Sequence, residues 1–172
     1  MSGPDTGMNA VHKFAAGGAA LALAISGIAA PAHAQYRQKI SNDMSKCSSG
    51  AGPAVKVTVT GIKSSSGKIR VQSYRGTKAD WLETGKWIHR IESSARAGSM
   101  TFCMPVPAAG TYGIAVRHDV NGNGKTDIRT DGGAMSNNPS INIFNLGKPS
   151  YKKTAFNVGS GVTSITVNMR YM

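Results

Sequence analysis

Residues 55–60 read Val55-Lys56-Val57-Thr58-Val59-Thr60, with a valine at every second position and a polar residue after each. Successive side chains of a β-strand point to opposite faces, so this alternation predicts a strand with one buried and one solvated face. Similar alternation occurs at 68–72, 100–104, 112–117 and 165–171, with shorter candidates at 141–146 and 154–158. Gly, Ser, Asn and Pro separate these stretches. The pattern predicts an all-β chain, a single antiparallel β-sandwich of about seven strands.

The first 34 residues have the pattern of a secretory signal peptide. A short basic start precedes an apolar run at 14–30, and small residues surround a predicted cleavage after Ala34. The run is shorter than the roughly 20 apolar residues of a membrane span, and a proline follows it. Met1 and Met8 are alternative start sites. We therefore expect an exported protein, periplasmic or extracellular, that does not span a membrane after cleavage.

The rest of the chain is predicted to contain a polar lead-in at 35–53 and one β-sandwich domain at 54–172. This length suits one domain with a core and is short for two. The lead-in is Ser-rich and is expected to be loosely held. A long connection at 76–97 contains 78–84, which is predicted to form one or two helical turns ending at Gly85. A connection of this length is typical of a functional lid or of a crossover between sheets.

Cys47 and Cys103 are the two cysteines of the chain. An oxidising compartment favours their pairing, and two cysteines allow one intramolecular connectivity. If Met100, Phe102 and Met104 face the core, Cys103 points to the opposite face of its strand, where the lead-in can reach it. The spacing is too wide for a CxxC redox motif, and no His and Cys cluster suggests zinc. We predict a structural disulfide.

The chain is strongly basic, with a formal net charge of +12. For an exported protein this charge favours anionic envelope polymers or lipid headgroups as partners over nucleic acid. Solubility alone is the alternative interpretation. The cations are scattered, except for a small cluster of Lys148, Lys152 and Lys153 beside Tyr151. We expect a monomer that binds anionic envelope polymers weakly, or that binds another envelope protein.

Aromatic residues suggest a ligand surface. Trp81 and Trp87 lie in the long connection, and with Tyr74 and Tyr151 they would form a stacking platform for sugar rings. The alternative is that they anchor the core, because the chain has few aromatic side chains and a sandwich needs large apolar ones.

The stretch RHDVNGNGKTD, residues 117–127, has the oxygen spacing of a calcium loop. Positions one, three, five, seven (through its backbone carbonyl) and nine are Asp119, Asn121, Asn123, Lys125 and Asp127, and a glycine at position six permits the bend. Position twelve is a threonine where a bidentate acid is expected, and basic neighbours oppose a divalent cation. Any binding of calcium would be weak, and its role would be structural. The Asn-Gly pairs also favour a tight turn without metal, which is the preferred interpretation.

No catalytic motif is recognised. The exported part has two histidines, and His118 precedes Asp119 on a strand, so their side chains point to opposite faces. No nucleophile elbow of the GxSxG type occurs. His118 is expected to hydrogen-bond a neighbouring loop, and His89 lies in the long connection. We predict that the protein is not an enzyme; a hydrolase with an unrecognised site is the weaker alternative.

Several short motifs together resemble one family. They are Gly110-Thr111-Tyr112, the stretch from His118 to Asp127, Ser136-Asn137-Asn138-Pro139, Lys148-Pro149-Ser150-Tyr151 and Ala155-Phe156-Asn157-Val158. Over 54–171 the chain resembles the exported, uncharacterised bacterial family called domain of unknown function 2141. Ala134-Met135 departs from that pattern, since many relatives resemble Gly-Phe there.

The resemblance implies a small secreted sandwich, immunoglobulin-like or prealbumin-like, with no established activity. Together with the residue patterns, it favours a noncatalytic binding or accessory module of the envelope; a weakly calcium-stabilised loop is the less favoured interpretation of residues 119–127. A purely structural accessory domain remains the main alternative.

Overall fold

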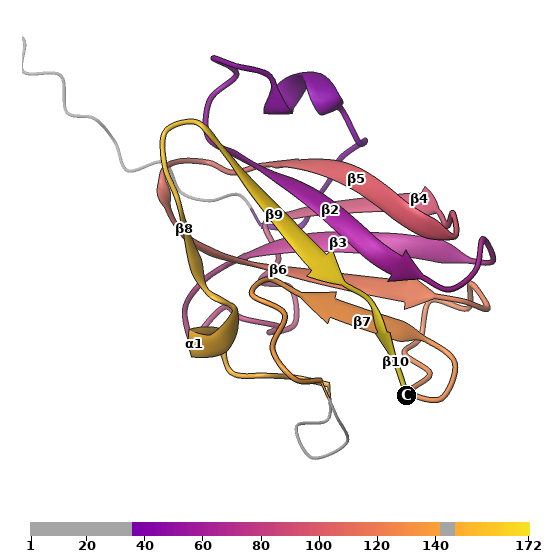
Figure 1. Ribbon diagram of the computed structural model, residues 1–172. Helices are drawn as coiled ribbons and strands as arrows, with labels where there is room; N and C mark the ends of the chain where they lie inside the picture. The colour runs from indigo at the N-terminus through magenta and orange to yellow at the C-terminus, as the bar shows by residue number, and fades with distance from the viewer. Residues whose placement is uncertain (1–35, 142–146) are drawn as a thin grey trace, which may run out of the picture. The chain divides into compact units, whose positions relative to one another are not determined.

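The structure is a computed structural model that describes residues 36–141 and 147–172. Within this part of the chain ten strands form two sheets (Figure 1). The larger sheet has the order β1 (Gln38–Lys39), β4 (His89–Ser94), β3 (Lys68–Arg75), β6 (Gly110–Asp119), β7 (Gly132–Met135) and β10 (Arg170–Tyr171), and β8 (Phe156–Val158) also pairs with β6. The smaller sheet has the order β5 (Gly98–Pro105), β2 (Ala54–Ile62) and β9 (Val162–Asn168). Two short helical segments are η1 (Met44–Cys47), a 3-10 turn, and α1 (Tyr151–Thr154).

The alternating valines confirm the predicted central strand. Val55, Val57 and Val59 of β2 are fully buried, and β2 lies between the two other strands of the smaller sheet. Val57 pairs with Phe102 of β5 on one side and with Ile165 of β9 on the other. Because the valines share one face of the strand, the period of two directly set which face of β2 is buried.

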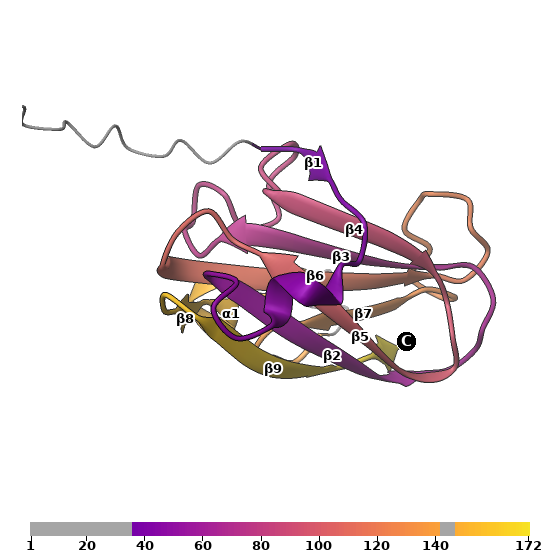
Figure 2. The ribbon, with the colours of Figure 1, turned by 90° about the horizontal axis from the view of Figure 1, so that it is seen from above.

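One hydrophobic core lies between the two sheets, which Figure 2 shows as separate layers, with β2 and β9 in one and β3 and β4 in the other. Each fully buried side chain of this kind contributes about 1.5–3 kcal/mol. The smaller sheet contributes the three valines of β2 together with Phe102, Met104 and Val167, and the larger sheet contributes Ile69, Val71, Ile91, Ile114 and Val116.

The prediction of antiparallel sheets with about seven strands was wrong in both respects. β2 pairs with β9 in parallel, and β1 pairs with β4 in parallel, so both sheets are mixed. Alternation reports the face that a side chain occupies, but it carries no information on the direction of the neighbouring strand. β1, β4 and β7 were missed: β1 has two residues, β7 is glycine-rich, and β4 lies in the stretch that was interpreted as a connection.

The stretch 165–171, predicted as one strand, is divided between the two sheets. β9 ends at Asn168 and β10 begins at Arg170, and the Met169 N–H donates to the Thr60 carbonyl at 2.9 Å. The chain thus passes from the smaller sheet to the larger within two residues. Tyr171 then reaches the edge of β7, where it pairs with Gly132.

Within the connection at 76–97, the predicted helical turns are not formed. Residues 78–84 form turns and not a helix, since Leu82 has a positive φ of 57°. Gly85, the predicted C-cap, has the positive φ (76°) expected at that position. A left-handed residue interrupts the helical path, which L-residues follow only at negative φ. The connection contains all of β4, which lies next to β3 in the same sheet. It is therefore not a crossover between sheets.

The lead-in is held more firmly than expected. Its backbone donates to the carbonyls of Trp87, Ile88 and Arg90 on β4 and the residues before it, and β1 extends the larger sheet. The predicted signal peptide at 1–34 lies outside the described residues, as does most of the strand predicted at 141–146, whose first residue, Ile141, is not in a strand. In the described part of the chain no helix is long and apolar enough to cross a membrane.

Candidate functional site

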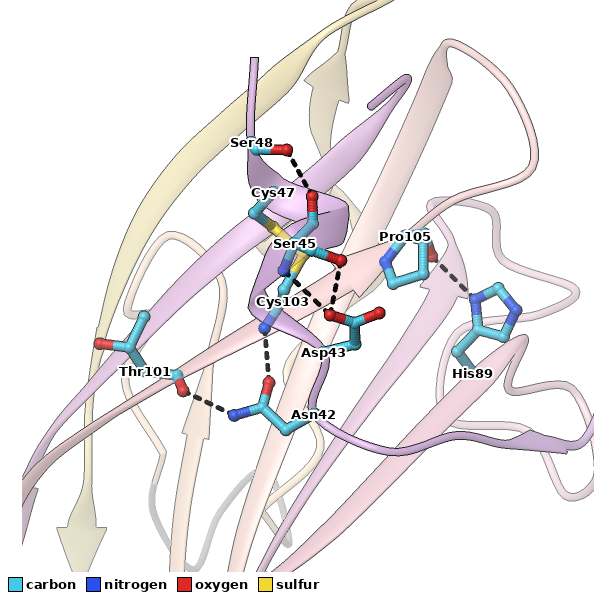
Figure 3. Close-up of a disulfide and its surroundings, with 9 residues drawn as sticks. All are labelled: Asn42, Asp43, Ser45, Cys47, Ser48, His89, Thr101, Cys103 and Pro105. Atoms are coloured by element: carbon cyan, nitrogen blue, oxygen red, sulfur yellow. Dashed lines mark hydrogen bonds between the residues drawn. A yellow bond between two sulfur atoms is a disulfide. The ribbon is translucent and has the colours of Figure 1, made fainter. Parts of the chain in front are cut away.

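Cys47 and Cys103 form the predicted disulfide, shown in Figure 3. The bond joins residues 56 positions apart and holds η1 against β5. Cys103 has no exposed surface, yet it does not belong to the core between the sheets. As predicted, it points to the outer face of its strand, and the lead-in covers it there.

The side chain of Asn42, in the lead-in, covers the free edge of β5 (Figure 3). Its Nδ2 donates to the Thr101 carbonyl at 3.0 Å, and its Oδ1 accepts from the Cys103 N–H at 2.9 Å. One side-chain amide thereby satisfies an acceptor and a donor of an edge strand, as a neighbouring strand would.

Next to Asn42, the Asp43 carboxyl caps η1. Hydrogen bonds from the Ser45 hydroxyl and N–H lower the pKa of this carboxyl.

The turn at Ser136-Asn137-Asn138 covers the opposite edge of the smaller sheet in the same way. Asn138 Nδ2 donates to the Thr166 carbonyl of β9 at 2.9 Å, and its Oδ1 accepts from the Asn168 N–H at 2.8 Å. Asn137 and Asn138 both have positive φ, a conformation that asparagine tolerates better than most residues. The motif was recognised only through the family resemblance, and its role was not predicted.

Ser136 holds this turn in place from inside the protein. It has no exposed surface, its Oγ accepts from the Ile114 N–H at 3.0 Å, and it donates to the Thr154 carbonyl at 2.5 Å. The hydroxyl therefore joins β6 to the end of α1. Its neighbour Asn137 donates to the Ala155 carbonyl at 3.0 Å, which connects the turn to the start of β8.

The loop from Asp119 to Asp127 is closed by its own side chains. Asp127 Oδ2 accepts from the amides of Asn121 and Asn123, both at 2.8 Å, and these hydrogen bonds lower the pKa of the Asp127 carboxyl. Asn121 Oδ1 accepts from the Asn123 N–H, and Asn123 Oδ1 accepts from the Lys125 N–H. The structure thus brings all five predicted ligand residues into one loop, with the amide oxygens bonded to backbone N–H groups.

Arg117 places a positive charge against this loop. Its guanidinium donates to Asp119 Oδ2 at 3.2 Å, to the Gly124 carbonyl at 3.0 Å and to Thr126 Oγ1 at 2.9 Å. Asp119 Oδ1 is buried and has no hydrogen-bond partner. Among residues 36–141 and 147–172, no three His, Cys, Asp or Glu side chains gather as a metal site would require. A guanidinium therefore contacts the loop's first acid and the carbonyl of its sixth residue.

Both histidines of the described chain have structural partners. A carbonyl only accepts, so His118 Nε2 donates to the Ser66 carbonyl at 2.7 Å, and the Tyr171 hydroxyl lies 2.7 Å from Nδ1. His118 joins β6 to the loop before β3, which confirms the expected role of a histidine at the end of a strand. His89 Nδ1 lies 2.8 Å from the Pro105 carbonyl.

The aromatic residues of the predicted sugar platform are mostly core residues. Tyr74, Trp81 and Trp87 are only 5–7 % exposed and belong to a second apolar cluster, with Met135, on the outer face of the larger sheet. Trp81 covers Gly113 so closely that a Cβ there would lie 2.5 Å from the indole ring. Both tryptophans therefore anchor this cluster, and they present no common open face.

Part of the predicted ligand surface does come together. Trp81, Lys148 and Tyr151 line one groove, together with Lys78 and Glu83. Trp87 lies outside this groove, where the Arg90 guanidinium covers its ring at 4.1 Å from the centroid. Lys152 and Lys153 are exposed on α1, beside Tyr151.

These features define a class of protein: two mixed β-sheets around one core, with one disulfide and motif residues that serve mainly the fold. The chain belongs to a family of uncharacterised proteins conserved in bacteria, DUF2141, whose family model matches residues 57–166. This confirms the resemblance seen in the sequence. No curated protein and no solved structure matches the chain.

Proposed function

We propose that this chain is a noncatalytic, exported β-sandwich protein of the cell envelope that binds anionic envelope polymers. The observation that carries the proposal is its net charge of +12 together with a groove whose cations lie beside aromatic side chains. Lys78 and Lys148 line that groove with Trp81 and Tyr151. Polymers with regularly spaced anionic groups complement scattered cations of this kind.

Export to the periplasm or the extracellular space is supported by the disulfide, because such bonds persist in oxidising compartments. We propose a monomer whose sandwich is immunoglobulin-like or prealbumin-like. The shared core between two sheets supports this assignment. A purely structural accessory domain is the alternative, and it is favoured by the number of motif residues that serve the fold.

A noncatalytic role is supported by the state of the titratable side chains. His118 is buried and both its ring nitrogens have partners, while His89 Nδ1 contacts the Pro105 carbonyl. Asp119 is paired with Arg117. A general base needs a nitrogen or oxygen free to reach a substrate. Both ring nitrogens of His118 are engaged, and the unpartnered Asp119 Oδ1 is buried.

The test is retention on immobilised heparin and on purified peptidoglycan during a salt titration. Attraction between exposed charges is screened over roughly 8 Å at physiological salt, so retention should fall as salt rises. Changing Lys148, Lys152 and Lys153 together to Glu should abolish retention at low salt. The matched control changes three exposed lysines near the other end of the chain, Lys39, Lys46 and Lys56, to Glu.

An equal loss in the control variant would show that the binding is not located at the groove. Absence of retention at low salt, or retention that is unchanged in high salt, would reject the electrostatic proposal itself.

We also propose that calcium binds the Asp119–Asp127 loop weakly at most and in a structural role. An ion would have to replace the Arg117 guanidinium at Asp119 and release the amide oxygens from backbone N–H groups. Dissociation constants of roughly 10⁻⁴ to 10⁻³ M are typical of extracellular calcium modules.

Arg117→Gln should tighten calcium binding in isothermal calorimetry, since it removes the competing cation. The control is the same variant with Asp119→Asn and Asp127→Asn, which should bind no calcium. If neither the parent protein nor the Arg117→Gln variant shows calcium binding in calorimetry, the loop is a turn without a metal site.

A further inference from the structure

A hollow of about 250 Å³ lies on the outer face of the larger sheet, on the side opposite the main core. Its floor consists of small residues on neighbouring strands, with Ala115 on β6 and Gly133 on β7. A Cβ built on Gly133 would have one neighbour, the Ile141 side chain, at an ordinary 3.8 Å. A larger side chain at this position would therefore enter the hollow.

The register of the strands explains the charged border of the hollow. Gly133 pairs with Arg117 on one side and with Arg170 on the other. Directly paired residues project to the same face of a sheet, so the two arginines lie on either side of the gap left by the glycine. Lys148 lines the hollow as well.

Apolar side chains form its walls and its mouth. Met135 and Leu82 lie within the hollow, and Ile128 and Met172 lie at its exposed border. Ile128 is 51 % exposed and Met172 is 49 % exposed, and in the described residues only Met44 joins them among large hydrophobic side chains open to solvent. Exposed apolar side chains that gather at one concavity indicate a binding site.

The charges at this site favour an anion. Asp131 is the one acid that lines the hollow, and both its oxygens accept backbone N–H groups, from Val120 and Asp127. Arg117 is neutralised by Asp119. Lys148 and Arg170 are exposed and leave a net positive charge at the border of an apolar hollow.

We propose that this hollow binds the single acyl chain of a fatty carboxylate, with the chain against Met135 and Leu82 and the carboxylate at Lys148 and Arg170. The volume of about 250 Å³ lies just below the usual range of ligand pockets, roughly 300–1,000 Å³, which fits one chain better than two. This site shares Lys148 with the groove proposed above for polymer binding, but it depends on an apolar hollow that polymer binding does not need.

The test is calorimetry with laurate below its micellar concentration, compared with dodecanol and with acetate. Laurate should bind at one site, dodecanol should bind much more weakly, and acetate should not bind. Chain length from octanoate to laurate should increase the affinity stepwise. Equal affinity for laurate and dodecanol, or no binding of laurate by the parent protein, would overturn the proposal.

Two kinds of variant locate the site. Gly133→Leu fills the hollow without changing the charge and should abolish laurate binding, whereas Gly161→Leu, at a position open to solvent, should leave it unchanged. Lys148→Gln with Arg170→Gln should weaken laurate binding about tenfold or more, since a hydrogen bond to a charged group is lost at each position.

Circular dichroism and thermal melting of Gly133→Leu establish that it is folded, and the chain-length series on the parent protein does not depend on any variant. Laurate binding by a folded Gly133→Leu protein would reject this site. Retention of the same variant on heparin should match that of the parent, so a failure here and a failure of polymer binding are distinguishable.

Discussion

The two free edges of the smaller sheet are each covered by the side-chain amide of an asparagine. The segments that carry these two asparagines are attached to the protein by different means. At β5, the Asn42 amide bonds the carbonyl of one residue and the N–H of the residue two positions later. At β9, Asn138 bonds Thr166 and Asn168 with the same spacing. Both arrangements occupy backbone groups that would otherwise be free to pair with another chain.

The difference lies in the attachment of each asparagine. Asn42 belongs to a lead-in that is held by a covalent bond five residues later, at Cys47, and by backbone pairing with β4. Asn138 belongs to a turn that is held by hydrogen bonds of the buried Ser136. The lead-in, outside the core, is thus held by a covalent bond and backbone pairing, whereas the turn next to the core is held by side-chain hydrogen bonds, those of Ser136 and Asn137.

Reduction of the disulfide should have the largest effect, because it frees the lead-in that covers β5. A cross-link that closes a loop of this size is worth about 2–4 kcal/mol in the free energy of unfolding. Reduction should lower the melting temperature while the β-sheet circular dichroism signal persists, since the core lies on the other face of β5. The Cys47→Ala and Cys103→Ala double variant should not respond to reductant. An unchanged melting temperature after complete reduction would contradict the proposed anchoring role.

Ser136→Ala should have the next largest effect. It leaves the Ile114 N–H and the Thr154 carbonyl without this buried partner, and an unsatisfied buried group costs about 1–3 kcal/mol. Urea denaturation should show the loss, and the exposed Ser160→Ala serves as the control. A destabilisation no greater than that of the control would mean that the turn is held by other contacts.

Asn138→Gly and Asn42→Gly form a matched pair, since glycine tolerates the positive φ of Asn138 and adds no side chain at either position. Each loses two partly solvated hydrogen bonds, at about 0.5–1.5 kcal/mol per bond. Each uncovered edge should also promote weak dimers, which sedimentation velocity would detect at high concentration. Dimers in one variant alone would show that only that edge is competent to pair.

A fall in pH should affect the edge of β5 more than the edge of β9. This is the smallest of the expected effects. Hydrogen bonds from Ser45 lower the pKa of Asp43 in the folded protein, so its contribution is present above the ordinary pKa of an aspartate and is lost as pH falls through the lowered value. As the pH falls, the protection factor against hydrogen exchange should therefore decrease at the Cys103 N–H relative to the Asn168 N–H. Asp43→Asn should remove this difference. An equal loss of protection at both amides would indicate general acid unfolding.

Much of the fold was predictable, since the valines of β2 and the alternating residues of β3, β5 and β6 face the core as expected. The disulfide was also predictable, because two cysteines allow one pairing and Phe102 fixes the face of Cys103. The short strands β1 and β7 were not predictable, since two to four residues carry too little period, and the alternation at 165–171 did not show that the chain changes sheet at Met169. Direction was hidden as well: the parallel pairing of β2 with β9 depends on how the chain returns after β8.

The candidate site divides in the same way. The loop residues Asp119 to Asp127 were found by their spacing, but their hydrogen bonds to each other and to Arg117 are visible only once the loop is closed. Trp81 and Trp87 were ambiguous, because composition does not state whether an indole covers a glycine or faces solvent. The hollow over Gly133 had no signal in the sequence, since it requires β6, β7 and β10 to be adjacent.

The sequence by itself determined the class of fold, the buried face of each long strand and the disulfide, because side-chain period and cysteine number are local or combinatorial properties. The tertiary structure alone decided strand direction, the covering of both sheet edges by Asn42 and Asn138, and the apolar hollow. Those features depend on backbone groups and small residues that meet from distant parts of the chain, and a missing side chain or a free carbonyl has no pattern along the sequence.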